Sequence, residues 1–184
     1  MRVETERLIL RELTLDDWPA VLAYQRDPRY LRYYAWEDRS EAEVREFVAM
    51  LVGFQNEQPR RRFQLGITLR EGGELIGNCG IRRKPDSETE ADIGYELSPG
   101  HWGRGYATEA ARALVDIGFG EWGLHRISSW CIADNQASAR VLERLGLKLE
   151  GRLRENERFK GRWWDTLLYG LLEEEWHAGQ LGAR

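Results

Sequence analysis

The feature that most constrains this chain is a glycine-rich turn, residues 100–105, between an alternating apolar segment and an alanine-rich one. Residues 91–97 before the turn alternate as a half-buried strand does, and residues 106–118 after it have good helix propensity. In that strand Tyr95 and Leu97 share the apolar face, so Glu96 must point to the other face. A strand that passes through a glycine turn into a helix is therefore the central prediction.

A turn of this kind can bind a phosphate. Backbone N–H groups in the first turn of a helix lack intrahelical partners, and the helix dipole favours negative charge beside them. Arg104 adds a local cation. The alternative is that the glycines only permit a tight turn. A P-loop is not indicated, because Tyr106 and Ala107 follow the last glycine, and a dinucleotide-binding fingerprint is not indicated, because position 108 is Thr.

The remaining segments predict a mixed α/β order in one domain. Strands are expected at residues 8–10, 63–69, 75–81, 91–97, 124–133, 147–153 and 163–172, helices at 14–27, 40–51, 106–118 and 138–145, and a short terminal segment at 173–176. The second helix is clearly marked, since Ser40 and Glu43 have capping-box spacing. No repeat, low-complexity tract or linker divides the sequence, so residues 1–184 are expected to fold as one unit.

Charge and composition exclude several functions. The chain has 27 Lys and Arg against 31 Asp and Glu, a net charge of −4 without a basic tail, which argues against nucleic acid or an anionic membrane as the main partner. Cys79 and Cys131 lack C-x-x-C spacing and the three histidines are scattered, so neither a disulfide framework nor a metal site is expected. No apolar run approaches the roughly 18 residues that span a bilayer. A cytoplasmic protein is expected.

Four segments carry a family resemblance. The longest is the strand, turn and helix start of residues 95–110. The others are residues 6–11, residues 134–138 with 145–147, and residues 160–165. In this order and spacing they resemble the GNAT superfamily of N-acetyltransferases, and most closely its ribosomal-protein N-acetyltransferase branch. The resemblance covers nearly the whole chain.

The resemblance implies an α/β (α+β) fold with a mixed, mostly antiparallel sheet that is splayed in the middle and flanked by helices. The pantetheine arm of acetyl-CoA, the co-substrate, would lie in the gap, beside backbone groups near Glu96 and Leu97. A backbone N–H at Leu97 would also stabilise the reacting carbonyl oxygen. The pyrophosphate would sit on the backbone amides of Gly103, Gly105, Tyr106, Ala107 and Thr108. Asn135 would bind pantetheine or the strand backbone, although an Asp-Asn pair is also common in turns.

The sequence departs from the superfamily pattern at two positions. Trp102 stands where Gln or Arg is usual, as in the ribosomal-protein branch, and it remains a candidate cofactor contact. Leu142 replaces the tyrosine that often protonates the departing thiolate. The resemblance gives that role to Ser138. The alternative for Ser138 is capping of the helix start.

Glu96 is the candidate general base, acting directly or through water, because it lies at the strand end beside the expected thioester. A solvent-facing carboxylate is the alternative. Direct attack requires a neutral amine, which an α-amino group (pKa about 7.7 to 8.0) supplies more easily than lysine (about 10.4).

The preferred acceptor is therefore a protein N-terminus. Acetylation of a small amine (polyamine, antibiotic or amino acid) and a non-catalytic acetyl-CoA sensor are the alternatives. The resemblance is also compatible with a homodimer, for which the sequence marks no interface.

Overall fold

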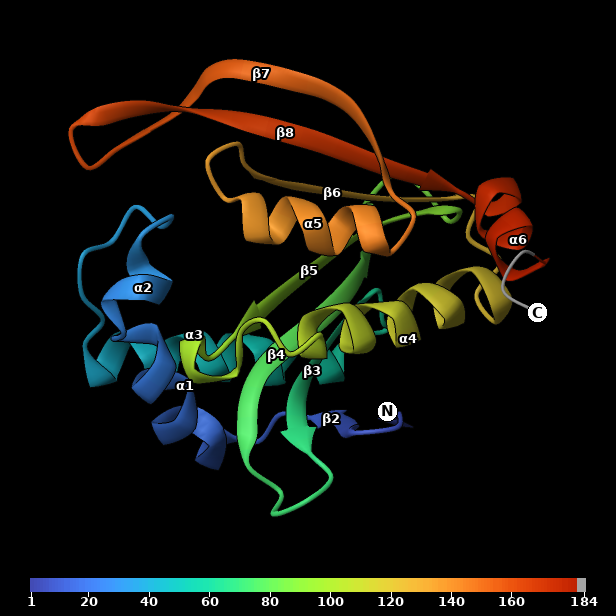
Figure 1. Ribbon diagram of the computed structural model, residues 1–184. Helices are drawn as coiled ribbons and strands as arrows, with labels where there is room; N and C mark the ends of the chain where they lie inside the picture. Colours follow the sequence, from blue (N-terminus) through green and yellow to red (C-terminus); the bar gives the residue numbers. More distant parts are fainter. Residues whose placement is uncertain (182–184) are drawn as a thin grey trace.

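The alternating segments form eight strands of one sheet in the computed structural model, which describes residues 1–181 (Figure 1). The strands are β1 (Arg2–Glu4), β2 (Leu8–Glu12), β3 (Arg62–Leu69), β4 (Leu75–Arg83), β5 (Glu90–Leu97), β6 (Arg126–Ile132), β7 (Lys148–Phe159) and β8 (Arg162–Leu172). The α-helices are α1 (Trp18–Gln25), α2 (Pro28–Leu31), α3 (Glu41–Gly53), α4 (Tyr106–Gly120), α5 (Gln136–Arg144) and α6 (Glu173–Leu181).

The sheet is mostly antiparallel, with one parallel contact near its middle. The strand order is β1-β2-β3-β4-β5-β6-β8-β7, and only β5 and β6 are parallel neighbours among the described strands. Their pairing covers three residues each, from Glu90 to Asp92 and from Arg126 to Ser128. Beyond that point the hydroxyl of Ser129 bonds the Ile93 carbonyl at 2.8 Å, and the two strands separate. The predicted splayed, mostly antiparallel sheet is confirmed.

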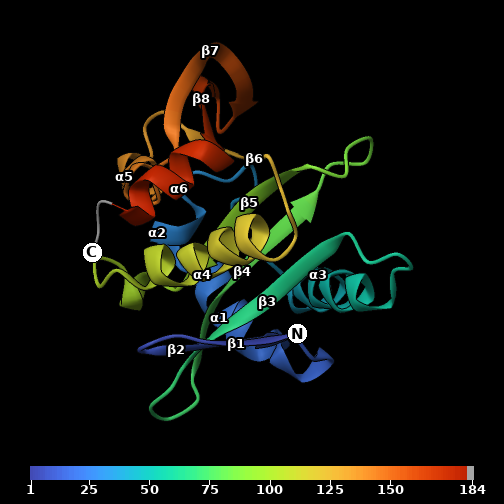
Figure 2. The same ribbon diagram turned by 90° about the vertical axis from the view of Figure 1, so that its right-hand side faces the viewer.

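Two apolar clusters cover the two faces of the sheet. Helices α4 and α5 pack on one face, where Leu114 and Leu142 are fully buried against the strands. Helices α1 and α3 lie on the other side of the sheet (Figure 2). They form a second cluster, which includes the fully buried Val21 and Val48. The α3 face of β4 and β5 carries polar residues and glycines near the splay instead of apolar side chains. This part of the sheet is therefore free to form the floor of a site.

Local sequence signals explain most element ends. Ser40 and Glu43 bond each other's backbone N–H groups at 3.2 and 2.7 Å, which confirms the predicted capping box at the start of α3. The first predicted helix is instead a 3-10 turn followed by α1, and the Asp27-Pro28 step starts the separate helix α2. The predicted strand 147–153 extends to Phe159, because β7 and β8 form a long hairpin.

The predicted short terminal segment is the beginning of α6. Strand β1 had no alternating pattern long enough to predict it. None of the helices within residues 1–181 combines the length and apolar character needed to cross a membrane.

Helix α4 packs closely on the sheet at Gly118. A Cβ there would lie 2.9 Å from Ile81 and 3.0 Å from Ile127, whereas a Cβ at Gly53 in α3 would meet nothing within 4 Å. We expect Gly118→Leu to lower the free energy of unfolding by about 1 to 3 kcal/mol through overpacking. Gly53→Leu, the matched control, should cause no loss. Denaturant unfolding measures both, and equal stabilities would contradict this packing.

Candidate functional site

The separation of β5 and β6 opens a cavity of about 1030 Å³, the central cavity. Its walls come from β5, β6 and the first turns of α4 and α5, and from α2, α3, β3 and β4. All but one of the residues predicted for the site line this cavity. They are Glu96, Leu97, Trp102, Gly103, Gly105, Tyr106, Ala107, Thr108, Asn135 and Ser138. Arg104 is exposed and is not part of the lining, so its role as a local cation stays a prediction.

The glycine turn has the geometry that the sequence predicted. Gly103 and Gly105 have φ angles of 76° and 83°, a left-handed conformation that other residues adopt only at a cost. Gly105 is the N-cap of α4, and no side chain caps this helix. The first i to i−4 bond of the helix is donated by the Glu109 N–H. The N–H groups of Tyr106, Ala107 and Thr108 precede that bond, and these residues line the central cavity.

The N-terminal segment holds this turn in place, which sequence reasoning missed. Arg7 donates to the Arg104 carbonyl at 3.0 Å and to the Glu109 carboxylate at 2.7 Å, and its guanidinium lies 4.7 Å from the Tyr106 ring centre. Thr5 also donates to Glu109 at 2.6 Å. Burial opposes the charge on Glu109, yet the bonds from Thr5 and Arg7 lower its pKa. The available signal was that residues 6–11 are one of the four segments of the family resemblance.

Trp102 braces the turn against the end of β5. Its indole N–H donates to the Leu97 carbonyl at 2.7 Å, while 44% of the residue remains exposed beside the central cavity. The indole N–H is thus used within the protein. A contact of Trp102 with a ligand stays a prediction.

Glu96 lies on the floor of the central cavity, on the face opposite Tyr95, as the strand alternation predicted. Its carboxylate accepts hydrogen bonds from the Tyr24 hydroxyl at 3.2 Å, from Gln25 at 3.1 Å and from Asn78 at 3.1 Å. Asn78 is the direct cross-strand neighbour of Glu96. Burial raises the pKa of the Glu96 carboxyl, although these hydrogen bonds oppose the shift. The result is a held carboxylate with greater proton affinity than an exposed one.

Aromatic residues of the α2 region surround this carboxylate. Tyr30 and Tyr34 stack with their ring centres 4.6 Å apart, and Tyr34 stacks on Trp36 at 4.7 Å. Burial, followed by the nearby Glu96 charge, raises the pKa of both tyrosines, so their hydroxyls stay protonated. The Tyr30 hydroxyl is buried and has no hydrogen-bond partner among the described residues. It lines the central cavity beside Glu96.

Ser138 lies across the gap from the end of β5. The Tyr95 hydroxyl is 3.0 Å from the Ser138 hydroxyl and also donates to the Ser138 carbonyl at 3.0 Å. The cap of α5 is Asn135, which accepts the Ser138 N–H at 3.2 Å, so Ser138 itself is not the cap. Tyr95 was missed as a site residue because its strand position indicated only an apolar face. The ligand role of Asn135 stays a prediction.

Leu142 of α5, which stands where the superfamily often has a tyrosine, does not line the central cavity. Leu142 is fully buried in the core, so no proton donor replaces the absent tyrosine there. Arg140 and Arg144 line the central cavity, and neither forms an ion pair with a described residue.

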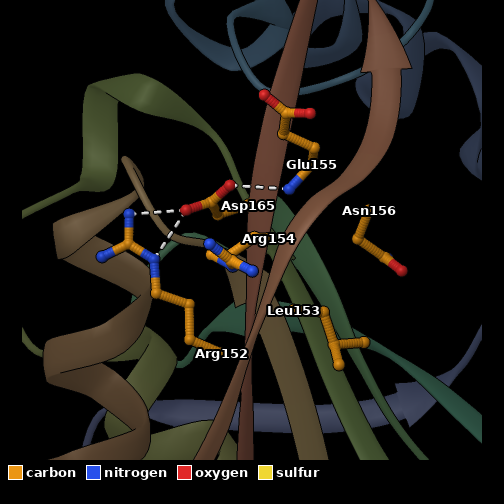
Figure 3. Close-up of a pocket in the computed structure, with 6 residues that line it drawn as sticks. All are labelled: Arg152, Leu153, Arg154, Glu155, Asn156 and Asp165. Atoms are coloured by element: carbon orange, nitrogen blue, oxygen red, sulfur yellow. Dashed lines mark hydrogen bonds and ion pairs between the residues drawn. The ribbon is translucent and has the colours of Figure 1, made fainter.

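A second hollow, of about 780 Å³, lies on the β7–β8 hairpin (Figure 3), and none of the predicted site residues lines it. Asp165 occupies its floor and accepts from Arg152 at 2.6 Å and from the Glu155 N–H at 2.8 Å. The strand pairing is irregular here, between Leu153 and Glu157. The hollow therefore reflects a bulged hairpin in which Arg152 and Asp165 are paired with each other.

Comparison with known proteins gives one consistent result. The model of the acetyltransferase (GNAT) domain matches residues 7–148. An uncharacterised N-acetyltransferase of Bacillus licheniformis, p20, is 35% identical over 175 residues, which cover 94% of this chain and 96% of the relative.

Solved structures agree with that comparison. The crystal structure of a GNAT-family acetyltransferase from Bacillus anthracis has a TM-score of 0.82 and 31% identity, covering 95% of this chain and 99% of that one. RimL, a ribosomal L7/L12 α-N-protein acetyltransferase solved in complex with coenzyme A, has a TM-score of 0.80 at 23% identity and covers 94% and 98% of the two chains. At this identity the likeness to RimL is one of fold.

The raised pKa of Glu96 has a consequence for stability. Folding favours the protonated carboxyl, so the cost of ionising Glu96 is absent well below its ordinary pKa of 4.5 and complete above its raised folded pKa. We expect Glu96→Gln to raise the melting temperature relative to wild type increasingly as pH rises through this window.

Glu12 is the control, because its pKa shift has the opposite sign. Burial opposes its charge, but hydrogen bonds from Arg60 and the N-terminal amine lower its pKa, so Glu12→Gln should lower the melting temperature at neutral pH. Thermal unfolding from pH 4 to 8 checks both variants. A Glu96→Gln variant that loses stability as pH rises would contradict the assigned environment.

Proposed function

The chain belongs to the GNAT acetyltransferase family, and we propose that it transfers the acetyl group of acetyl-CoA to the α-amino group of a protein. The N-acetyltransferase activity follows from the family. The acceptor is the part that is proposed. The observation that carries the proposal is that one cavity brings together an uncapped helix start and a buried carboxylate.

The glycine turn is proposed to bind the pyrophosphate of acetyl-CoA. The N–H groups of Gly103, Gly105 and the first turn of α4 supply directional donors, and a charge-assisted hydrogen bond is worth about 1.5 to 3 kcal/mol. Arg7 supports this role because it fixes the turn from behind. The pantetheine arm would then lie in the gap, along the backbone near Leu97 and beside Asn135. RimL, the fold neighbour solved with coenzyme A, agrees with a ligand of this class.

Glu96 is proposed as the general base. The acceptor ammonium gives one proton to the Glu96 carboxylate, directly or through a water, and that proton returns to solvent through the central cavity. The neutral nitrogen attacks the thioester carbonyl carbon. The C–N bond forms, the C–S bond breaks, and the second proton lost by the nitrogen ends on the sulfur.

Ser138 is proposed to stabilise the departing thiolate by donating a hydrogen bond to the sulfur. The 3.0 Å contact with the Tyr95 hydroxyl supports this role because it holds the Ser138 side chain at the gap. The single hydroxyl proton of Ser138 turns from Tyr95 to the sulfur as the thiolate departs. The N–H of Leu97 is the proposed donor to the carbonyl oxygen as negative charge develops on it. The reaction then needs no covalent enzyme intermediate.

With Glu96 as the one proposed base, the α-amino group of a protein is an easier acceptor to deprotonate than a lysine side chain. An α-amino group has a pKa of about 7.7 to 8.0, so a carboxylate can deprotonate it at lower cost than a lysine of about 10.4. Tyr34 lines the central cavity with Trp36 stacked behind it, and it supplies an apolar wall for residues that follow the amine. A homodimer is compatible with this proposal.

Replacing Glu96 tests the chemistry. We expect Glu96→Gln to lower kcat by about 10²- to 10⁴-fold, the usual contribution of general base catalysis. In the wild type kcat should fall on the acid side of a pKa above 4.5, because the protonated carboxyl is no base. Thiol release from acetyl-CoA with pooled amines and peptides, measured against pH, checks both. An unchanged pH profile in Glu96→Gln would exclude Glu96 as the base.

Gly103 tests the cofactor turn. Gly103 and Gly123 both have positive φ, and a Cβ at either would meet nothing within 4 Å. We expect Gly103→Val to weaken acetyl-CoA binding at least about tenfold, by distorting the turn, whereas Gly123→Val should leave it unchanged at a similar cost to stability of about 1 to 2 kcal/mol. Titration calorimetry with acetyl-CoA measures both. Equal affinities in the two variants would place the cofactor elsewhere.

A further inference from the structure

Two glycines face each other on the α3 side of the sheet. Gly80 in β4 is the direct cross-strand neighbour of Gly94 in β5. A Cβ at Gly80 would lie 2.0 Å from the Gln64 amide oxygen, and one at Gly94 would lie 2.9 Å from an Arg82 Nη atom. The absence of both side chains is what lets Gln64 and Arg82 lie flat across the strands and line the central cavity.

Arg82 is held on this floor without using all its donors. Its Nε donates to Asp92 at 2.8 Å and its Nη1 to the Gln64 amide oxygen at 3.3 Å. Its Nη2 also contacts Asp92. A guanidinium has five N–H donors, so two remain after these contacts. Because Asp92 neutralises the charge, the remaining donors suit a neutral carbonyl oxygen better than a second carboxylate.

A chain of buried amides connects Arg82 to Glu96. Arg82 donates to Gln64, Gln64 donates to Asn78 at 2.6 Å, and Asn78 donates to Glu96 at 3.1 Å. Gln64 is 5% exposed and Asn78 is 2% exposed. Each amide has one orientation that satisfies both neighbours. The chain therefore fixes the guanidinium and the carboxylate relative to each other.

The bare backbone of Gly94 lies between these two groups. Gly94 and Glu96 are two residues apart on one face of β5, about 7 Å along the strand. One aminoacyl unit of about 3.5 Å with a hydrogen bond of about 2.9 Å at each end reaches up to about 9 Å when fully extended, so a bent arrangement covers this distance. Resting on the proposed function, we propose that Arg82 binds the carbonyl oxygen of the acceptor's first residue while Glu96 receives its amine. The acceptor class is then the α-amino amide, the terminus of a peptide.

The charges of the central cavity agree with this acceptor class. Its acidic lining residues among those described are Glu96 and Asp134, and Asp134 is paired with Arg162 at 2.6 Å. A polyamine would need a second carboxylate for its distal ammonium, and none is free. A free amino acid would bring its carboxylate close to Asp92.

The test compares four acceptors: a tripeptide amide, alanine, n-propylamine and spermidine. Thiol release from acetyl-CoA gives kcat/KM for each. The wild type should prefer the tripeptide amide. Arg82→Met should lower the ratio of kcat/KM for the tripeptide amide to that for n-propylamine by about 10- to 100-fold, as expected for loss of a charged hydrogen bond. The pKa values of the amines affect this ratio equally in every variant, so they do not contribute to the difference between variants.

Two further variants keep the test decisive. Gly94→Ala places a methyl group against the guanidinium and should lower the same ratio, even where Arg82→Met fails to fold. Arg70→Met, which removes an arginine paired with Glu4 outside the central cavity, should leave it unchanged. A ratio unaffected by both Arg82→Met and Gly94→Ala, or a wild type that prefers alanine or n-propylamine, overturns this inference alone. A wild type that releases no thiol with any amine overturns the proposed function with it.

Discussion

The parallel pairing of β5 and β6 is limited to three residues on each strand, and the rest of the site depends on that limit. Parallel strands in a continuous sheet would bond each other along their length and leave no space between them. Here the Ser129 hydroxyl marks the end of the contact, and beyond it both strands line the central cavity. A co-substrate arm can thus reach the middle of the sheet without disturbing the strands on either side.

The two halves of the central cavity differ in their electrostatics. On the α4 side the protein offers backbone N–H groups to an anion and needs little charge of its own, which is consistent with a net charge of −4. On the α3 side it buries Glu96 and must oppose the cost of that burial with three neutral donors. Neutral partners leave the carboxylate with a raised pKa, whereas an arginine at the same distance would have lowered it.

The sequence predicted what local pattern determines. The glycine turn, the capping box at Ser40 and the placement of Glu96 on the face opposite Tyr95 each follow from spacing along one segment. The contacts that complete the site join distant segments, and no local rule indicates them. Arg7 reaches a turn about a hundred residues away, and Tyr95 meets a helix beyond the next strand. The aromatic residues around Glu96 come from α2 and the loop after it, and no local pattern indicates that they meet a carboxylate on β5.

The Arg7 contact also links the glycine turn to the order in which the chain can assemble. A contact between residues 7 and 104 closes a long loop, and such contacts form late because their entropic cost comes before their gain. Helix α4 can therefore be complete while the turn before it is still unbraced. A nascent chain would gain its secondary structure first, and the proposed affinity of the turn for acetyl-CoA would follow only after the N-terminal strands dock.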